Sequence, residues 1–303
     1  MKLTNLTKSV LAASALTVAS FGANAGVVAT AFLDMKELGI EIDVNGDGVA
    51  DALPPGASLS DFVTILSSTR GGNTAGNFTG FPDATNGDVS SSTTLPVINA
   101  ELACTGPDCG GLTNDFVLTS GVINDDTMNY GLGDMQVSGN ALTGSSSGYT
   151  YADAATTMNA TEAGSNGTIS NTVGATIQFA TAVNVRFVGL YDIFVETFQD
   201  AAIAADPFRN AVATAGTSFV LNLGNKSIGV VGSTDTLDVA GEVDLTNQTF
   251  TSTWASFGPL ETTTLNIIQS STANVTLVPE PTSVAILGLG LLGFAGAARR
   301  RKS

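Results

Sequence analysis

The sequence predicts an all-β protein: an antiparallel β-sandwich-like domain with long polar loops. Apolar and polar residues alternate with a period of two in several segments, which is typical of strands with one buried face. β-Branched residues and short polar turns recur at the intervals of a sandwich. Charged residues make up only 13% of the 303-residue chain, and Gly, Ser, Thr, Asn and Ala are abundant. Such a composition is typical of an extracellular β protein with many turns.

The clearest alternation lies in the C-terminal half of the chain. Three segments place their apolar side chains on one face and their polar side chains on the other: 183–187, 218–223 and 274–277. A strand is also the first expectation for residues 194–205. Because Phe194, Phe198 and Ala202 are four residues apart, one helical turn is the alternative for that segment.

A hairpin is expected further along the chain. Residues 237–245 and 249–257 would be its strands, and Thr246-Asn247-Gln248 would be its turn. Trp254, the single tryptophan, would then lie on a strand and pack in the core rather than serve as a sugar platform.

The N-terminal half is less periodic. Residues 62–67 and 116–123 are expected to be strands. Gly, Asn, Ser and Thr dominate residues 70–95 and 138–172, which predicts loops or partly disordered segments there. No repeat and no Pro-rich linker marks a boundary, so residues 26–277 are expected to form one β-rich extracytoplasmic domain.

Two features of composition exclude whole classes of function. The chain has no histidine, which excludes Ser-His-Asp and Cys-His catalysis and histidine-ligated zinc, although it leaves carboxylate chemistry open. Residues 26–298 carry 5 basic residues against 27 acidic ones, a net charge of −22. Such a surface repels phosphate backbones, so we expect no nucleic-acid partner.

The N-terminus has the three parts of a secretory signal peptide, residues 1–25. Lys2 and Lys8 supply the positive start, an apolar stretch runs from Val10 to Phe21, and Ala23-Asn24-Ala25 forms the cleavage site. The stretch is too short and too rich in Ala and Ser for an ordinary transmembrane anchor. The signal predicts export across the inner membrane and removal by signal peptidase.

The C-terminus, residues 278–303, combines a short motif, an apolar stretch and a basic end. The motif is Val278, Pro279, Glu280 and Pro281, and the uncharged stretch from Thr282 to Ala298 follows it. As a helix these 17 residues would measure about 25 Å, enough to cross a bilayer core. The basic cluster would stay cytoplasmic, and its members are Arg299, Arg300, Arg301 and Lys302. The two prolines would leave an extended, accessible peptide before the helix.

This order of motif, apolar helix and basic end resembles the PEP-CTERM family of sorting tails, with Pro279, Glu280 and Pro281 as the matching residues. The same tail is also described as an ice-binding protein C-terminal domain, a description that does not imply ice binding. The resemblance implies an exosortase-type membrane processing enzyme as partner, transient membrane anchoring and final placement at the cell surface or outside the cell. It also implies an association with exopolysaccharide. The alternative is a simple anchor that is never cut.

A calcium site is expected directly after the N-terminal segment of the domain. Asp43, Asn45 and Asp47 alternate as in an EF-hand-like loop, and Val49 and Asp51 follow at positions that could supply a carbonyl and a carboxylate. The loop departs from the pattern at its twelfth position, where a proline, Pro54, replaces the bidentate glutamate. An Asx-rich solvent turn is the alternative.

Cys104 and Cys109 are the only cysteines, and they enclose a Gly-Pro turn. In an exported protein this spacing predicts a structural disulfide rather than free thiols.

Three functions follow as hypotheses. The first is a non-enzymatic structural or adhesive protein of the envelope or exopolysaccharide matrix. The second is a carbohydrate- or ice-binding module, which requires a row of exposed Thr or aromatic residues on one sheet. The third is a polysaccharide-acting hydrolase, which requires two carboxylates facing each other across a cleft.

Overall fold

The structure is a computed structural model. It describes nine segments of the chain: residues 26–69, 73–79, 98–109, 129–139, 146–157, 161–169, 174–205, 209–236 and 242–279. The expected signal peptide, the expected strand at 116–123 and the apolar and basic parts of the C-terminal tail lie outside these residues.

The described residues form two seven-stranded sheets in which every pairing is antiparallel. Sheet A has the order β12 (Val243–Thr251), β9 (Val183–Gln199), β1 (Val27–Asp43), β6 (Ser146–Thr156), β5 (Tyr130–Ser138) and β4 (Ile98–Thr105), and β13 (Ala255–Phe257) also pairs with β9. Sheet B has the order β11 (Lys226–Thr236), β10 (Arg209–Leu223), β14 (Thr262–Pro279), β7 (Thr161–Ile169) and β3 (Asn73–Thr79). Its remaining strands are β8 (Gly174–Phe179), which pairs with β14, and β2 (Val63–Thr69), which pairs with β8.

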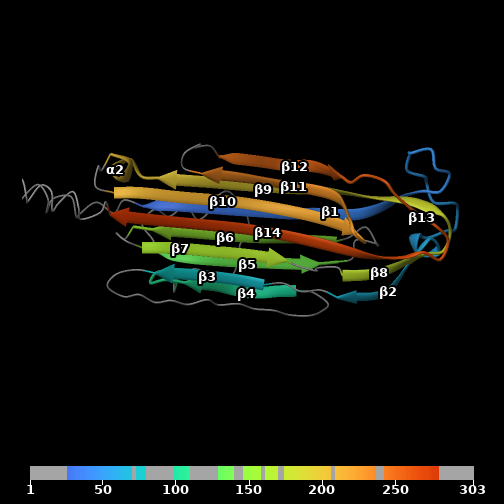
Figure 1. Cartoon of the computed structure of the whole chain (residues 1–303), viewed down its shortest axis with the longest axis horizontal. Coiled ribbons are helices and arrows are strands. Elements are labelled where there is room, and N and C mark those ends of the chain that lie inside the picture. Colours follow the sequence, from blue (N-terminus) through green and yellow to red (C-terminus); the bar gives the residue numbers. More distant parts are fainter. Residues whose placement is uncertain are drawn as a thin grey trace, which may run out of the picture.

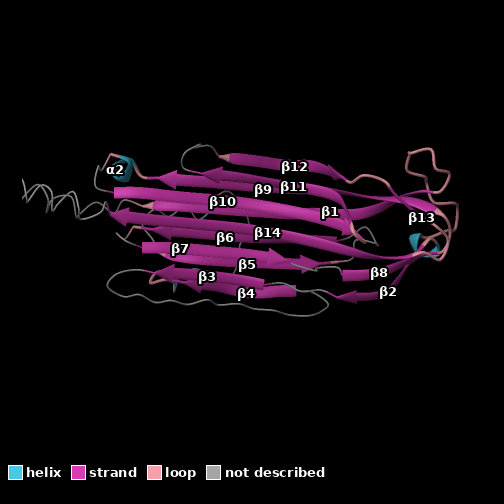
Figure 2. Cartoon of the chain, in the orientation of Figure 1, coloured by secondary structure: helices cyan, strands magenta, loops and turns pink. Residues whose placement is uncertain are grey.

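The strands run along the long axis of the molecule (Figure 1). Within the described segments, two short helical turns lie between strands: the 3-10 helix η2 (Leu59–Asp61) precedes β2, and α2 (Ala201–Ala204) follows β9. Figure 2 shows them at opposite ends of the long axis, as the two cyan elements. The expected all-β sandwich is therefore confirmed.

The core lies between the two sheets and follows the period of two. In β1 the alternate residues Val27, Ala29 and Leu33 are fully buried, and Leu265 and Leu277 of β14 are buried opposite them in the same cluster. Removing such a side chain from water contributes about 1.5–3 kcal/mol for each Val or Leu. In β10 and β14, whose other faces are mostly polar, a shift by one residue would expose the whole apolar set, so the alternation fixes the register of these strands.

Polar bonds also join the sheets through the core. The amide Nε2 of Gln269 in β14 donates to the carbonyl of Leu33 at 2.8 Å and to that of Gly148 at 3.0 Å, both in sheet A. The hydroxyl of Ser271 donates to the carbonyl of Thr150 at 3.0 Å. Buried polar groups require such partners, so these bonds fix how one sheet lies on the other.

Several predicted strands are confirmed. The segment 62–67 falls almost wholly in β2, 183–187 in β9, 274–277 in β14, and 218–223 in β10. Residues 194–205 combine both alternatives, because β9 continues to Gln199 and α2 then forms a single turn.

Two segments predicted to be loops contain strands, and the rest of residues 70–95 lies outside the described part of the chain. The strand β3 lies within 70–95, and β6 and β7 lie within 138–172. β6 is an interior strand of sheet A, and its core positions hold small residues such as Ala152 and Ala154, both fully buried. Small residues bury little apolar area, so their alternation carries a weak signal in the sequence.

The predicted hairpin is also wrong, because β12 is one strand that pairs with β9 on both sides of Asn247. Asn247 has a φ of 51° and forms a bulge, not a turn. Its amide N–H donates to Asp192 at 2.7 Å, and its side-chain oxygen accepts from Lys36 at 2.8 Å. These bonds hold the left-handed conformation that asparagine tolerates. Trp254 lies between β12 and β13, half-buried, and not on a strand.

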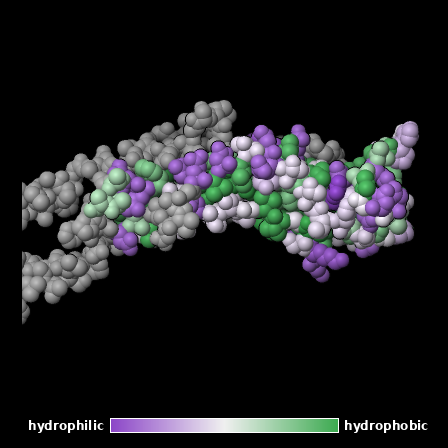
Figure 3. All heavy atoms as spheres, turned by 90° about the horizontal axis from the view of Figure 1, so that it is seen from above, coloured by the Kyte–Doolittle hydropathy of each residue, from purple (hydrophilic) through white to green (hydrophobic). Residues whose placement is uncertain are grey.

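One long edge of the sandwich is formed where β11 and β12 meet. Phe250 of β12 packs edge-on against Phe219 of β10, with 5.2 Å between the ring centroids, and so closes the core at this edge. Seen from above, hydrophilic and hydrophobic residues are intermixed over the described surface (Figure 3).

Candidate functional site

The loop that follows β1 begins at Asp43, whose carboxylate lies under it. One oxygen of Asp43 accepts a hydrogen bond from the amide of Gly46 at 2.6 Å. The other accepts from the amide of Gly48 at 2.9 Å and from the side chain of Asn184 at 3.0 Å. The bond from Asn184, and then those from the amides, hold the pKa of Asp43 below its usual value although burial opposes them.

The other expected calcium ligands form a chain of Asx turns. The side-chain oxygen of Asn45 accepts from the amide of Asp47 at 2.8 Å, and Asp47 accepts from the amide of Val49 at 2.8 Å. Asp51 closes the loop by accepting from the amide of Val44 at 2.7 Å and from the Asn45 side chain at 3.0 Å. The structure therefore brings the predicted residues together in one loop.

The oxygen-bearing side chains of the loop already have hydrogen-bond partners within it. Within the described part of the chain, no group of three or more Asp, Glu, Cys or His side chains is placed to hold a metal ion. Calcium takes six to eight oxygen ligands, and both carboxylate oxygens of Asp43 and of Asp51 already accept hydrogen bonds. As arranged, the loop does not form a calcium cage, and its occupation by calcium stays a prediction.

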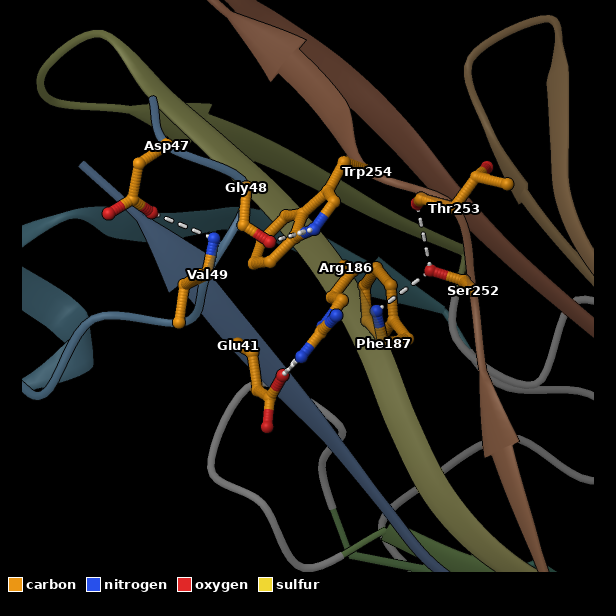
Figure 4. Close-up of polar contacts among 9 residues, drawn as sticks. All are labelled: Glu41, Asp47, Gly48, Val49, Arg186, Phe187, Ser252, Thr253 and Trp254. Carbon is orange, nitrogen blue, oxygen red and sulfur yellow. Dashed lines mark hydrogen bonds and ion pairs between the residues drawn. The ribbon is translucent and has the colours of Figure 1, made fainter. Parts of the chain in front are cut away.

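Trp254 ties this loop to sheet A (Figure 4). Its indole N–H donates to the carbonyl of Gly48 at 3.1 Å. The guanidinium of Arg186 lies 4.5 Å from the centroid of the indole ring, and it also binds the Glu41 carboxylate at 2.6 Å. Cation–π and ionic contacts thus use the same arginine. The sequence offered no signal for this contact, because Arg186 and Trp254 are far apart in the chain.

The structure pairs Cys104 and Cys109 in a disulfide, with 5.8 Å between their Cα atoms. Cys104 lies in β4, and both cysteines pack against an apolar cluster on the outer face of sheet A. The bond thus fixes the turn that follows β4.

That outer face also holds a buried carboxylate, which sequence reasoning missed. Asp153 accepts hydrogen bonds from the hydroxyls of Thr30 at 3.0 Å, Tyr130 at 2.8 Å and Tyr151 at 2.9 Å. Burial raises the pKa of Asp153 to about 7, although these hydrogen bonds favour the ionised form. The signal in the sequence was the period-two spacing of Tyr149, Tyr151 and Asp153, which places all three on one face of β6.

Two further carboxyls nearby have raised pKa values. Burial raises the pKa of Asp134 to about 6, although it accepts a hydrogen bond from Tyr149 at 3.0 Å. Burial and then the neighbouring Asp192 raise the pKa of Asp34 to about 6. Asp134 and Asp153 are fully enclosed, so they do not present the cleft-facing pair that a hydrolase requires.

The predicted sorting motif begins inside the sandwich. Val278 and Pro279 are the last two residues of β14 and lie opposite Asn210 and Arg209 of β10. The peptide before Glu280 is thus part of sheet B and not a free linker, contrary to the expectation of an accessible peptide for these two residues.

Both ends of the described chain leave the sandwich at the same end. Val27 at the start of β1 lies opposite Gln199 at the end of β9, and the carbonyl of Gly26 accepts a hydrogen bond from the amide of Asp200 at 3.0 Å. β10 begins ten residues after Gln199, next to the end of β14, as Figure 1 shows at the left. The Asp43 loop lies at the opposite end, at the right of that view.

Comparison with known proteins decides the nature of the tail. The family model described as the PEP-CTERM protein-sorting motif matches residues 277–302. The chain carries a PEP-CTERM sorting motif. No curated protein matches the chain, and no solved structure matches it.

The PEP-CTERM motif indicates export, transient anchoring by the tail and processing by an exosortase-type membrane enzyme. The match begins at Leu277, which still pairs with Thr161 of β7 and Ala211 of β10, so the PEP-CTERM region and the sandwich share the end of β14. None of the helices in the described segments is long and apolar enough to cross a membrane. The expected apolar helix of the PEP-CTERM tail lies beyond those segments.

Proposed function

We propose that this protein is a non-enzymatic structural or adhesive component of the cell surface or extracellular matrix, associated with exopolysaccharide. The sorting system delivers it, and the sandwich is the part that acts after delivery. The single observation that carries the proposal is the position of the sorting motif, which continues β14 without a spacer at the end where the chain also enters the sandwich.

This arrangement favours a domain that stands on the membrane by one end while it is anchored. The 18 residues of β14 extend for about 60 Å at 3.3 Å per residue. The two sheet faces and the loop after β1 would then be presented away from the attachment point. A long body with an acidic surface and an attachment at one end suits a matrix component.

Removal of the tail in cells tests delivery. We expect a chain that lacks residues 278–303 to lose its surface or matrix location and to lack the processed C-terminus that mass spectrometry finds in the full chain. A matched control replaces Pro279, Glu280 and Pro281 with alanine and keeps the apolar stretch and the basic cluster. We expect it to be anchored but not processed. If the truncated chain reaches the same place in the same form and the matrix is unaltered, the proposal is wrong.

Calcium binding by the Asp43 loop is a separate proposal, supported by the spacing of its oxygen ligands. Asp43→Ala is a poor test because it removes three hydrogen bonds whether or not calcium binds. Asp47→Asn is sharper, since an amide oxygen can keep the turn to Val49 while the charge is lost. We expect calcium to raise the Tm of the full chain and Asp47→Asn to reduce that rise. An equal Tm with calcium and with a chelator contradicts the proposal.

A carbohydrate- or ice-binding module is the second candidate function. The observation that favours it is a group of exposed threonines on sheet B, whose members include Thr214, Thr234 and Thr272.

A further inference from the structure

The outer face of sheet B carries no charge over most of the length of β10, β14 and β11. The outward positions of β10 from Asn210 to Asn222, of β14 from Thr262 to Thr276 and of β11 from Val230 to Thr236 hold only Thr, Ser, Asn, Gly, Val and Ile. None of these outward residues is aromatic. The single acid of the β11 segment, Asp235, points inward, where it accepts hydrogen bonds from the amide and hydroxyl of Thr197.

The register aligns hydroxyl side chains into rows across this face. Thr214 lies between Thr236 of β11 and Asn274 of β14, and the next row places Thr234 and Thr272 on either side of a glycine. Neighbouring strands lie about 4.8 Å apart, and successive outward residues of one strand about 6.6 Å apart. Each threonine adds one hydroxyl and one methyl group to a regular two-dimensional array.

The face is also free of long side chains at these positions. A Cβ atom added at Gly216 would lie 3.2 Å from the methyl group of Thr234 and 3.8 Å from the hydroxyl of Thr272, so these two threonines border the glycine closely. In the row beyond, the hydroxyls of Ser218 and Ser270 are hydrogen-bonded at 2.8 Å. A long flat ligand therefore meets only short side chains along this part of β10 and β14.

The charge distribution indicates which class of ligand this face can bind. Residues 26–298 have a net charge of −22, which disfavours an anionic polymer near the molecule. Over these outward positions of β10, β11 and β14 a neutral ligand displaces only water from hydroxyl, amide and methyl groups, and no charge has to be desolvated there. We propose that this face binds a neutral polysaccharide lying along the strands. The inference rests on the proposed matrix function, whose partner surface it names.

The test uses the full chain, purified in detergent, and three insoluble neutral polymers: cellulose, chitin and a cross-linked dextran. Depletion of the protein from solution measures binding, with alginate as the anionic comparison. We expect retention on at least one neutral polymer and none on alginate. The double variant Thr214→Lys and Thr272→Lys should weaken that binding by at least about tenfold. Binding would remove water from the two lysine ammonium groups, and a neutral polymer offers no charge to compensate for it.

Thr249→Lys is the matched control, since Thr249 is also exposed but lies on β12 of sheet A. It should change the affinity for the polymer by less than about twofold, because a lysine that stays in water outside the binding face contributes little to the binding free energy. Circular dichroism and the Tm of each variant show that the fold is kept. Binding that survives the double variant, or that is found on alginate alone, overturns the inference.

Two other occupants give distinct results that also overturn it. A second copy of the chain would show as a dimer in sedimentation that the double variant dissociates, without polymer binding. Ice would show as partition of the protein into a growing ice front, again without polymer binding. Neither result bears on tail-dependent delivery, so the inference can fail while the proposed function stands.

Discussion

At the scale of single residues, three carboxyls of sheet A make stability depend on pH. The pKa of Asp153 is raised to about 7 and those of Asp134 and Asp34 to about 6, from an ordinary value of 3.8. Between pH 4 and 7 the folded chain therefore holds more protons than the unfolded chain. Its free energy of unfolding must fall as the pH rises through this window.

Asp153→Asn isolates one part of this dependence. From pH 6 to 7 we expect the wild-type chain to lose about 1 kcal/mol of stability through Asp153, out of a total effect of at most about 4 kcal/mol. Over the same interval the variant should lose about 1 kcal/mol less than the wild type, because its amide does not titrate and only Asp134 and Asp34 still do. The chain has no histidine, so no imidazole obscures the result. Urea unfolding at half-unit pH steps measures it, and parallel curves for the two proteins would contradict the assignment.

At the scale of elements, the sequence predicts strands well where bulky apolar residues mark one face. Phe187 in β9 and Phe219 in β10 are buried large side chains, and the strands around them are predicted correctly. Prediction fails where the buried face is built from small residues, as at Ala152 and Ala154 of β6. There the burial comes from the neighbouring strands, which no local window contains.

The candidate site divides in the same way. The loop from Asp43 to Asp51 is local, so its residue spacing predicts that these side chains meet. The contact between Arg186 and Trp254 and the cluster around Asp153 join distant strands, and only the strand order of sheet A brings them together. Asn247 shows a third case. Its surrounding sequence is typical of a turn, but the residue forms a bulge because it is hydrogen-bonded to Asp192 of β9 and to Lys36 of β1.

At the scale of the whole molecule, the end of β14 belongs both to the sandwich and to the sorting signal. Val278 and Pro279 pair with β10, and they also belong to the region matched by the sorting motif, which implies processing by an exosortase-type membrane enzyme. Pairing with β10 and recognition by the enzyme therefore compete for the same residues. The folded sandwich should slow the processing of its own tail, because the last pairs must open first.

A flexible spacer removes this competition. We expect about six Gly and Ser residues inserted between Leu277 and Val278 to speed conversion to the processed form, because a free linker no longer holds the motif in the sheet. Pulse-chase labelling of cells measures the fraction of full-length chain over time. The same insertion after Pro55, in the exposed loop before β2, should leave the rate unchanged. An unchanged or slower rate for the spacer at 277 would mean that the enzyme reads the motif in the presence of its strand pairing, and β10 would then be part of what it recognises.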